Sequence, residues 1–191
     1  MSALPKGLIS REMTKGVKGV ETVRNSLLPV SQAPFAPDGN NRVIFEIPSL
    51  HNAFLTQRSY FTFTLKTNAN TTKFFRGPMV PFKRMVVRAP NGTILEDIND
   101  FHLFSKVKDV LYKSKCDLES EFATTKSSLA IDQAMWDTEQ QTFIEGNGVP
   151  VIFKPQSGLL GEEQQFFIPV NQIASSVGYA LHIELTLLEP E

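Results

Sequence analysis

The chain has 191 residues, enough for one compact domain with a real core and too few for two comfortable ones. Its 19 basic and 20 acidic residues give a formal net charge of −1, so no overall field draws the chain to nucleic acid or to a membrane surface. Fifteen Phe and twelve Pro favour many short strands separated by turns over a helical bundle, and the single cysteine, Cys116, excludes an intrachain disulfide.

The N-terminus gives no export signal, because Pro5, Lys6 and Gly7 interrupt its apolar residues before a continuous apolar stretch can form. No segment approaches the ~20 consecutive apolar residues that a membrane-spanning helix needs. We therefore expect a chain without a membrane span that is not secreted through a signal peptide.

Residues 1–38 predict an extended N-terminal arm, because they carry no sustained apolar period and several prolines hold their last part extended. Five basic side chains against two acidic ones give residues 1–28 a mild positive bias. Such an arm is either a solvated tail or a segment that orders against a neighbouring subunit or an enclosed polyanion. The candidate assembly residues on this arm are Lys6, Arg11, Lys15, Lys18, Arg24, Pro34 and Phe35.

Two strand patterns follow the arm. Val43, Phe45 and Ile47 alternate with other residues until a proline ends the run, which predicts a strand over 42–48. Over 58–67 apolar and polar side chains alternate again, as in a sheet with one wet face.

Residues 82–89 and 93–98 predict a β-hairpin. Met85 and Val87 alternate with more polar neighbours in its first strand, and a second alternating run follows the turn. Asn91-Gly92 between the strands is the dipeptide that most readily adopts the positive φ angles of a two-residue hairpin turn.

A helical insertion follows the hairpin, because the spacing of apolar residues changes from two to three and four. Asn99 or Asp100 is available to accept hydrogen bonds from the free amides of the first helix, and Asp117 is expected to cap the second. The helices are expected at 99–113 and 117–135, within an insertion at about 99–136.

Four more strands are predicted after the insertion, at 140–145, 149–154, 164–170 and 178–188. Together with the earlier four they make eight, and no repeat recurs at the period of a propeller or solenoid. We therefore expect a mainly β fold, an eight-stranded antiparallel sandwich that forms a single domain over 39–191. Eight is the strand number of a jelly roll, although the count alone does not separate a jelly roll from other sandwiches.

The sequence shows no catalytic constellation. His51, His102 and His182 lack the spacing of a metal site, and Cys116 has no base near it in the sequence. The densest acidic cluster, residues 96–100, is better explained by strand solvation and helix capping than by calcium binding. We therefore expect no enzyme activity, no metal and no cofactor, and a structural or binding role.

Four stretches stand out together: Asn41-Arg-Val-Ile-Phe-Glu-Ile-Pro48, Asn91-Gly-Thr-Ile-Leu-Glu-Asp-Ile-Asn-Asp100, Ser157-Gly-Leu-Leu-Gly161 with Phe167-Ile-Pro-Val170, and Leu181-His-Ile-Glu-Leu-Thr-Leu187. Their order over residues 40–188 resembles the N-terminal jelly roll of the double-jelly-roll major capsid proteins of double-stranded DNA viruses. That lineage includes adenoviruses, virophages and polinton-like elements.

The resemblance implies a jelly roll whose strands stand upright to an icosahedral virion shell, whose loops face outward and whose arm lies beneath, in reach of the genome. It implies a structural capsid subunit without enzyme activity, made in the host cytoplasm or nucleus, that self-associates or assembles with other capsid proteins. The family's major proteins carry two such domains per chain, and the resemblance here covers one. A penton-type or minor subunit, a processed half, and one partner of a mixed capsomer are therefore all open.

The alternative is a ligand-binding β-sandwich, either lectin-like or receptor-binding. Such a module needs a cluster of aromatic and polar side chains in the loops at one end of the sandwich. The single tryptophan, Trp136, gives that alternative little support.

Overall fold

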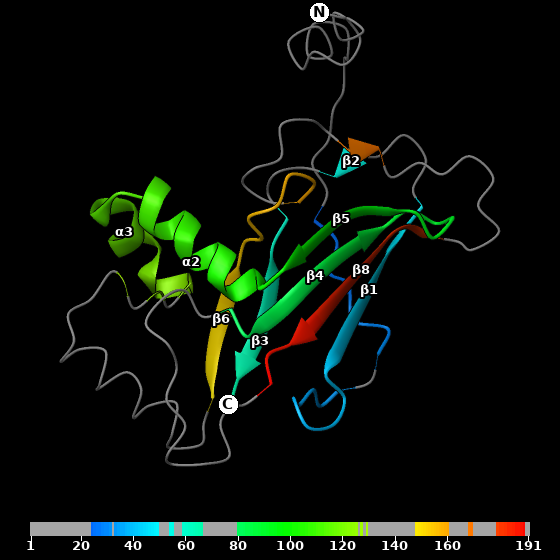
Figure 1. Ribbon diagram of the computed structural model, residues 1–191, viewed down its shortest axis with the longest axis horizontal. Helices are drawn as coiled ribbons and strands as arrows, with labels where there is room; N and C mark the ends of the chain where they lie inside the picture. The colour runs from blue at the N-terminus through cyan, green and yellow to red at the C-terminus, as the bar shows by residue number, and fades with distance from the viewer. Residues whose placement is uncertain are drawn as a thin grey trace, which may run out of the picture.

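The computed structural model describes residues 24–31, 33–49, 54–55, 59–66, 80–125, 127, 129, 148–160, 168–169 and 179–189. Its strands are β1 Arg42–Pro48, β2 Phe54–Leu55, β3 Phe61–Leu65, β4 Phe82–Arg88, β5 Ile94–Asn99, β6 Val149–Phe153, β7 Ile168–Pro169 and β8 Tyr179–Leu187. Its helices are α2 Phe101–Tyr112 and α3 Lys115–Thr125. The described chain is mainly β, with both helices together beyond the end of β5 (Figure 1). Within these ranges no helix is long and apolar enough to cross a bilayer.

Four strands form one antiparallel sheet in the order β1-β8-β4-β5. The first strand therefore pairs with the last, with Phe45 opposite Ile183, and on its other side β8 pairs with β4, where Val87 lies opposite Ile183. β5 returns beside β4 as the predicted hairpin. Two shorter antiparallel ladders join β3 to β6 and β2 to β7.

The core lies between the four-stranded sheet and the β3–β6 ladder. Phe63 of β3 meets Phe82 of β4 edge to face, with ring centroids 5.5 Å apart. Phe61 of β3 lies 5.3 Å from Phe45 of β1, again between ring centroids. Two β layers that pack their aromatic side chains against each other have the arrangement of a β-sandwich. Burying a side chain of this size contributes roughly 1.5–3 kcal/mol, so packing between the layers is the main stabilising term.

The predicted alternation is confirmed in β8. Leu181, Ile183 and Leu185 are buried on the core face, while His182 and Glu184 are half-buried on the opposite face. This is the two-residue period of a strand with one dry side and one wetter side.

β4 departs from the expected alternation. Met85, Val86 and Val87 are all buried, although the pattern placed only Met85 and Val87 inward. β4 is an interior strand, and Val86 stands in register between Glu184 of β8 and Asp97 of β5. Long charged side chains cover apolar surface with their aliphatic parts, so a valine at the centre of a charged face can be shielded from water.

The hairpin is confirmed, but its turn differs from the predicted two-residue turn. Ala89 and Thr93 are joined by a backbone hydrogen bond of 2.8 Å, and the Gly92 amide donates to the Ala89 carbonyl at 2.9 Å. In this turn Gly92 has a positive φ of 83°, while Asn91 does not. Pro90 fixes a negative φ at the start of the turn, so the loop has three residues and ends with glycine in the left-handed region.

The predicted strands whose full range is described lie within three residues of their predicted ends. The predicted strand 140–145 lies outside the described residues, and of 164–170 only Ile168–Pro169 are described, so the count of eight stays a prediction. Phe54–Leu55 was missed, because two residues are too few to show an alternating pattern.

The first helix begins two residues later than predicted, and the expected side-chain cap was wrong. Asn99 is the last residue of β5, and Asp100 is the N-cap without a side-chain hydrogen bond to the helix. Asp100 has φ 49° and ψ 44°, in the left-handed region that Asp tolerates better than most residues. Because this single residue must join a strand directly to a helix, the joint uses its backbone, and its carbonyl still accepts the Phe104 amide at 2.9 Å.

The second helix ends earlier than predicted, at Thr125, and Ser127 lies outside it. The hydroxyls of Thr124 and Thr125 both donate to the carbonyl of Glu121, at 2.9 and 3.1 Å. Threonine side chains that bond to the preceding turn compete with the helical backbone, which explains the early end. Residues 130–135 of the predicted helix lie outside the described residues.

Candidate functional site

The candidate assembly residues are only partly placed by the structure. Lys6, Arg11, Lys15 and Lys18 lie outside the described residues. The guanidinium carbon of Arg24 lies 5.8 Å from the centre of the Tyr60 ring, within the range of a cation–π contact. Pro34 is exposed, whereas the half-buried Phe35 packs against the core. Of the candidates that the structure describes, Phe35 therefore contributes to the core and Arg24 contacts an aromatic ring, and the assembly site as a whole stays a prediction.

The described part of the arm runs along the edge of the main sheet. The Val30 amide donates to the Ile44 carbonyl at 2.7 Å, and the Ile44 amide donates to the Ser31 hydroxyl at 3.0 Å. Ile44 belongs to β1, the terminal strand of the sheet order. The arm therefore satisfies backbone groups on an edge that would otherwise offer them to another chain.

Charged side chains of opposite sign pair across the outer face of the four-stranded sheet. Arg84 of β4 binds Asp97 of β5 through two hydrogen bonds of 2.8 and 2.5 Å. Arg42 of β1 lies 3.3 Å from Glu184 of β8, measured between charged atoms. The imidazole of His182 on β8 lies 3.9 Å from the carboxylate of Glu46 on β1.

The Arg84–Asp97 pair shifts the pKa of both groups. Its side-chain hydrogen bonds hold the pKa of Asp97 below its ordinary value and raise the pKa of Arg84. Both side chains remain accessible to solvent, so water and salt screen the pair. The pair therefore orients β5 against β4 more than it stabilises the fold.

A shallow depression of about 440 Å³ lies on this face near the end of β8. Its lining combines three basic side chains, Arg42, Lys83 and Arg84, with three acidic ones, Asp100, Glu184 and Glu189. No aromatic side chain lines it. Charges of both signs without an aromatic platform do not form the cluster that a lectin-like module needs.

The predicted acidic cluster, residues 96–100, does not converge on one point. Asp97 faces Arg84 on the outer side, whereas Glu96 accepts hydrogen bonds from the Ser157 hydroxyl and from the Gly158 amide, the latter at 3.0 Å. The Ser157 hydroxyl also accepts the Leu160 amide at 3.0 Å. Glu96 therefore joins the hairpin to the Ser157-Gly-Leu-Leu segment, two of the stretches that stood out in the sequence.

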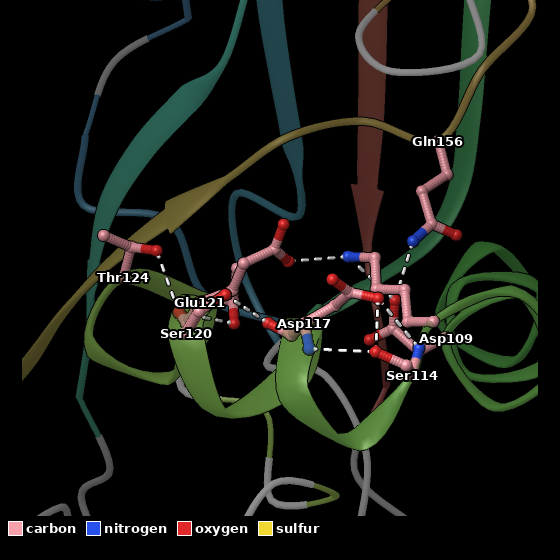
Figure 2. Close-up of polar contacts among 9 residues, drawn as sticks. Asp109, Ser114, Asp117, Ser120, Glu121, Thr124 and Gln156 are labelled. Atoms are coloured by element: carbon pink, nitrogen blue, oxygen red, sulfur yellow. Dashed lines mark hydrogen bonds and ion pairs between the residues drawn. The ribbon is translucent and has the colours of Figure 1, made fainter.

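Helix α2 turns a partly polar face toward the β layers. Phe101, Ser105 and Asp109, spaced by four residues, are its buried side chains. Only 3% of Asp109 is exposed, and its carboxylate accepts a hydrogen bond of 2.8 Å from the side-chain amide of Gln156. Gln156 follows β6, so this bond ties the helix to the sandwich (Figure 2).

A chain of polar contacts continues from Asp109 to helix α3. The Lys113 ammonium lies 3.2 Å from Asp109 and 2.8 Å from the carboxylate of Glu121. Gln156, Asp109, Lys113 and Glu121 thus form a polar layer, in which each charge has a partner (Figure 2). We call these four residues the polar layer.

The start of α3 shows a capping box. The Ser114 hydroxyl accepts the Asp117 amide at 3.2 Å, and the Asp117 carboxylate accepts the Ser114 amide at 3.0 Å (Figure 2). The predicted cap Asp117 was therefore wrong: Ser114 is the N-cap, and Asp117 lies in the first turn. The serine was missed because the apolar pattern marked the start of the helix two residues too late. Hydrogen bonds from the Ser114 side chain and backbone lower the pKa of Asp117.

Four buried polar atoms have no hydrogen-bond partner among the described residues: Ser105 Oγ, Ser127 Oγ, His102 Nδ1 and Gln156 Oε1. A buried polar atom without a partner costs roughly 1–3 kcal/mol.

The described residues hold no cluster of three or more His, Cys, Asp or Glu side chains that could bind a metal ion. His102 and His182 lie on different elements, His51 is outside the described ranges, and Cys116 is exposed on α3.

Comparison with family models, with curated proteins and with solved structures gives no match to this chain.

Proposed function

We propose that this protein is a structural subunit of an icosahedral virus capsid that assembles with copies of itself or with other capsid proteins. It is a jelly-roll subunit without enzyme activity or cofactor, and it works in the virion after synthesis in the host cytoplasm or nucleus. Its function is to present sheet edges, loops and helices to neighbouring subunits.

The observation that carries the proposal is the strand order β1-β8-β4-β5. The last strand lies between the first strand and the fourth, so the chain returns at its end to the place where its first strand began. Such long-range antiparallel returns are typical of Greek-key sandwiches, which include jelly rolls. The link between Glu96 and Ser157 supports the same proposal, because it brings together two of the stretches on which the capsid resemblance depends.

The two edges of the four-stranded sheet differ in a way that supports a role in assembly. Residues 30–31 occupy the β1 edge, whereas no described residue outside the hairpin forms a backbone–backbone hydrogen bond with β5, and the Gly158 amide reaches the side chain of Glu96 instead. One edge of the sheet is thus covered by the chain itself, and the β5 edge carries the half-exposed apolar side chains Ile94 and Leu95. A neighbouring subunit can pack there.

Light scattering after size-exclusion chromatography tests the proposal. The whole chain should form symmetric oligomers whose contacts each bury more than about 1,000 Å². A variant without residues 1–23, which keeps the contacts of Val30, Ser31 and Phe35, should form smaller or weaker oligomers. Identical monomers from both proteins, under every salt and concentration used for assembly, would contradict a capsid role.

A further inference from the structure

The outer face of α2 is apolar. Leu103, Val107, Val110 and Leu111 are 51%, 54%, 57% and 68% exposed, respectively. Val107 follows Leu103 by four residues, and Val110 and Leu111 follow Val107 by three and four, so the four side chains lie in one stripe along the helix. We call these four residues the α2 stripe. Ser105 and Asp109 lie on the buried side together with Phe101, so α2 buries two polar side chains while it exposes four apolar ones.

Lysines flank the α2 stripe on both sides. Lys106 and Lys108 precede and follow Val107, so each lies about 100° from it around the helix axis. Lys108 stacks over the rings of Phe104 and Tyr112, at 5.7 and 4.8 Å. Two α2 helices packed against each other would bring these lysines together, so the charges disfavour that contact.

Helix α3 offers the complementary surface. Cys116, Ser120 and Ala123 are exposed, and spacings of four and three residues place them on one face. Asp117 and Glu119 flank that face on opposite sides. Glu119 forms only a long surface pair with Lys115, at 3.6 Å, which is easily exchanged for another cation.

We propose that two copies of the chain associate through their helical pairs, with the α2 stripe of one copy on the small-residue face of α3 in the other. Large apolar side chains then pack over small ones, and lysines meet carboxylates on both flanks. Each copy contributes one α2 and one α3, so the contact is made twice around a twofold axis. Figure 1 shows both helices on the opposite side of the molecule from β1.

This inference names one surface of the self-association on which the proposed function rests. A helical contact of this kind leaves the sheet edges and the arm for other neighbours. It also accounts for the polarity of α2, because burial of the stripe in a dimer removes its apolar area from water.

A charge in the stripe tests the contact. Val107→Glu would bury a carboxylate in the interface, so the Kd for dimerisation measured by analytical ultracentrifugation should rise at least about ten-fold. The control is Ile152→Glu on β6, where the residue replaced is apolar and 36% exposed but belongs neither to the helices nor to the β5 edge. It should leave that Kd within about two-fold of the wild type. Circular dichroism should show both variants folded.

A charge exchange tests the pairing itself. A Lys106→Glu, Lys108→Glu variant and a Glu119→Lys variant should each dimerise more weakly than the wild type. An equimolar mixture of the two should associate more tightly than either alone, because opposite charges then face each other again.

The outcomes separate this inference from the capsid role. If the wild type assembles and Val107→Glu assembles equally well, or if the mixture gains nothing, the helical contact is wrong while the capsid role stands. If the wild type stays monomeric in all conditions, both fail. Dimers that respond to the helix variants but never build larger shells would uphold the contact and contradict the capsid role.

Discussion

The four-stranded sheet and helix α2 are both amphipathic, but in opposite senses. β8 buries Leu181, Ile183 and Leu185 and turns its charged residues outward. α2 buries Ser105 and Asp109 and exposes Leu103, Val107 and its other apolar residues. The outer face of the sheet is therefore polar, as is usual for a surface in contact with water. The exposed face of α2 is apolar and is stabilised when another surface covers it.

The two regions also differ in how they are held. Aromatic and aliphatic packing joins the β layers, while α2 is attached by one deeply buried aromatic side chain, Phe101, and by the polar layer. Close apolar packing between the layers resists displacement, whereas a buried polar pair depends on a few directional contacts and leaves an uncompensated group when one partner moves. Helices α2 and α3 are thus the region whose position a binding partner can most easily change.

The largest effect expected is that of Phe101→Ala. The Phe101 ring is fully buried and lies 5.7 Å from the ring of Phe153 in the core. Its loss should lower the free energy of unfolding by about 3–5 kcal/mol, as cavity-forming changes do. Urea unfolding followed by circular dichroism measures this. The control is Tyr112→Ala, an aromatic side chain at the end of the same helix that is 73% exposed and outside the α2 stripe, with an expected change below about 1 kcal/mol. Equal losses in both would mean that α2 is not anchored as described.

The second-largest loss of stability is expected for Asp109→Ala. It removes the shared partner of Gln156 and Lys113 and should cost about 2 kcal/mol. The cost stays below that of a fully buried pair, because Lys113 keeps Glu121 and is 17% exposed. The matched control is Glu119→Ala, whose pair with Lys115 is on the surface and should contribute less than about 0.5 kcal/mol.

Hydrogen exchange would show where the Asp109 change acts. Amides of α2 should lose protection more than amides of β8, because the polar layer holds the helix and not the sheet. Uniform loss over both elements would mean that the helical pair and the sheet unfold as one unit.

The strands could be predicted from the sequence because alternation with a period of two reports directly which face is buried. The predicted bounds held at 42–48 and alternating burial held along β8 from Leu181 to Leu185, but the pattern failed at Val86, where cross-strand neighbours shield an outward side chain. Those neighbours come from strands distant in sequence, so no local pattern contains them. The turn at Pro90 was misread for a different reason: the dipeptide Asn91-Gly92 was weighed without the proline before it.

The candidate assembly residues on the arm stay a prediction, because the structure describes only Arg24, Pro34 and Phe35 of the seven. The arm was chosen for its charge, whereas the residues that distinguish the structure are on the helical insertion. Asp109, Lys113 and Gln156 meet across 47 residues of sequence, which no spacing rule brings together. The α2 stripe could have been found, because apolar residues at both the inner and the outer positions of one helix indicate two covered faces.

The smallest effect expected concerns the charged outer face. The hydrogen bonds from Arg84 lower the pKa of Asp97 in the folded chain, so the pair stabilises the fold above the unfolded pKa of an aspartate, near 4. This contribution should be lost as the pH falls through the lower, folded pKa. Urea unfolding of the wild type and of Asp97→Asn between pH 6 and pH 2.5 measures it. The wild type should be slightly more stable at pH 6, the difference should shrink on acidification, and added salt should reduce it. A difference that grows toward low pH would mean that Asp97 is protonated more easily in the folded chain, and the assignment of the Arg84 pair would be wrong.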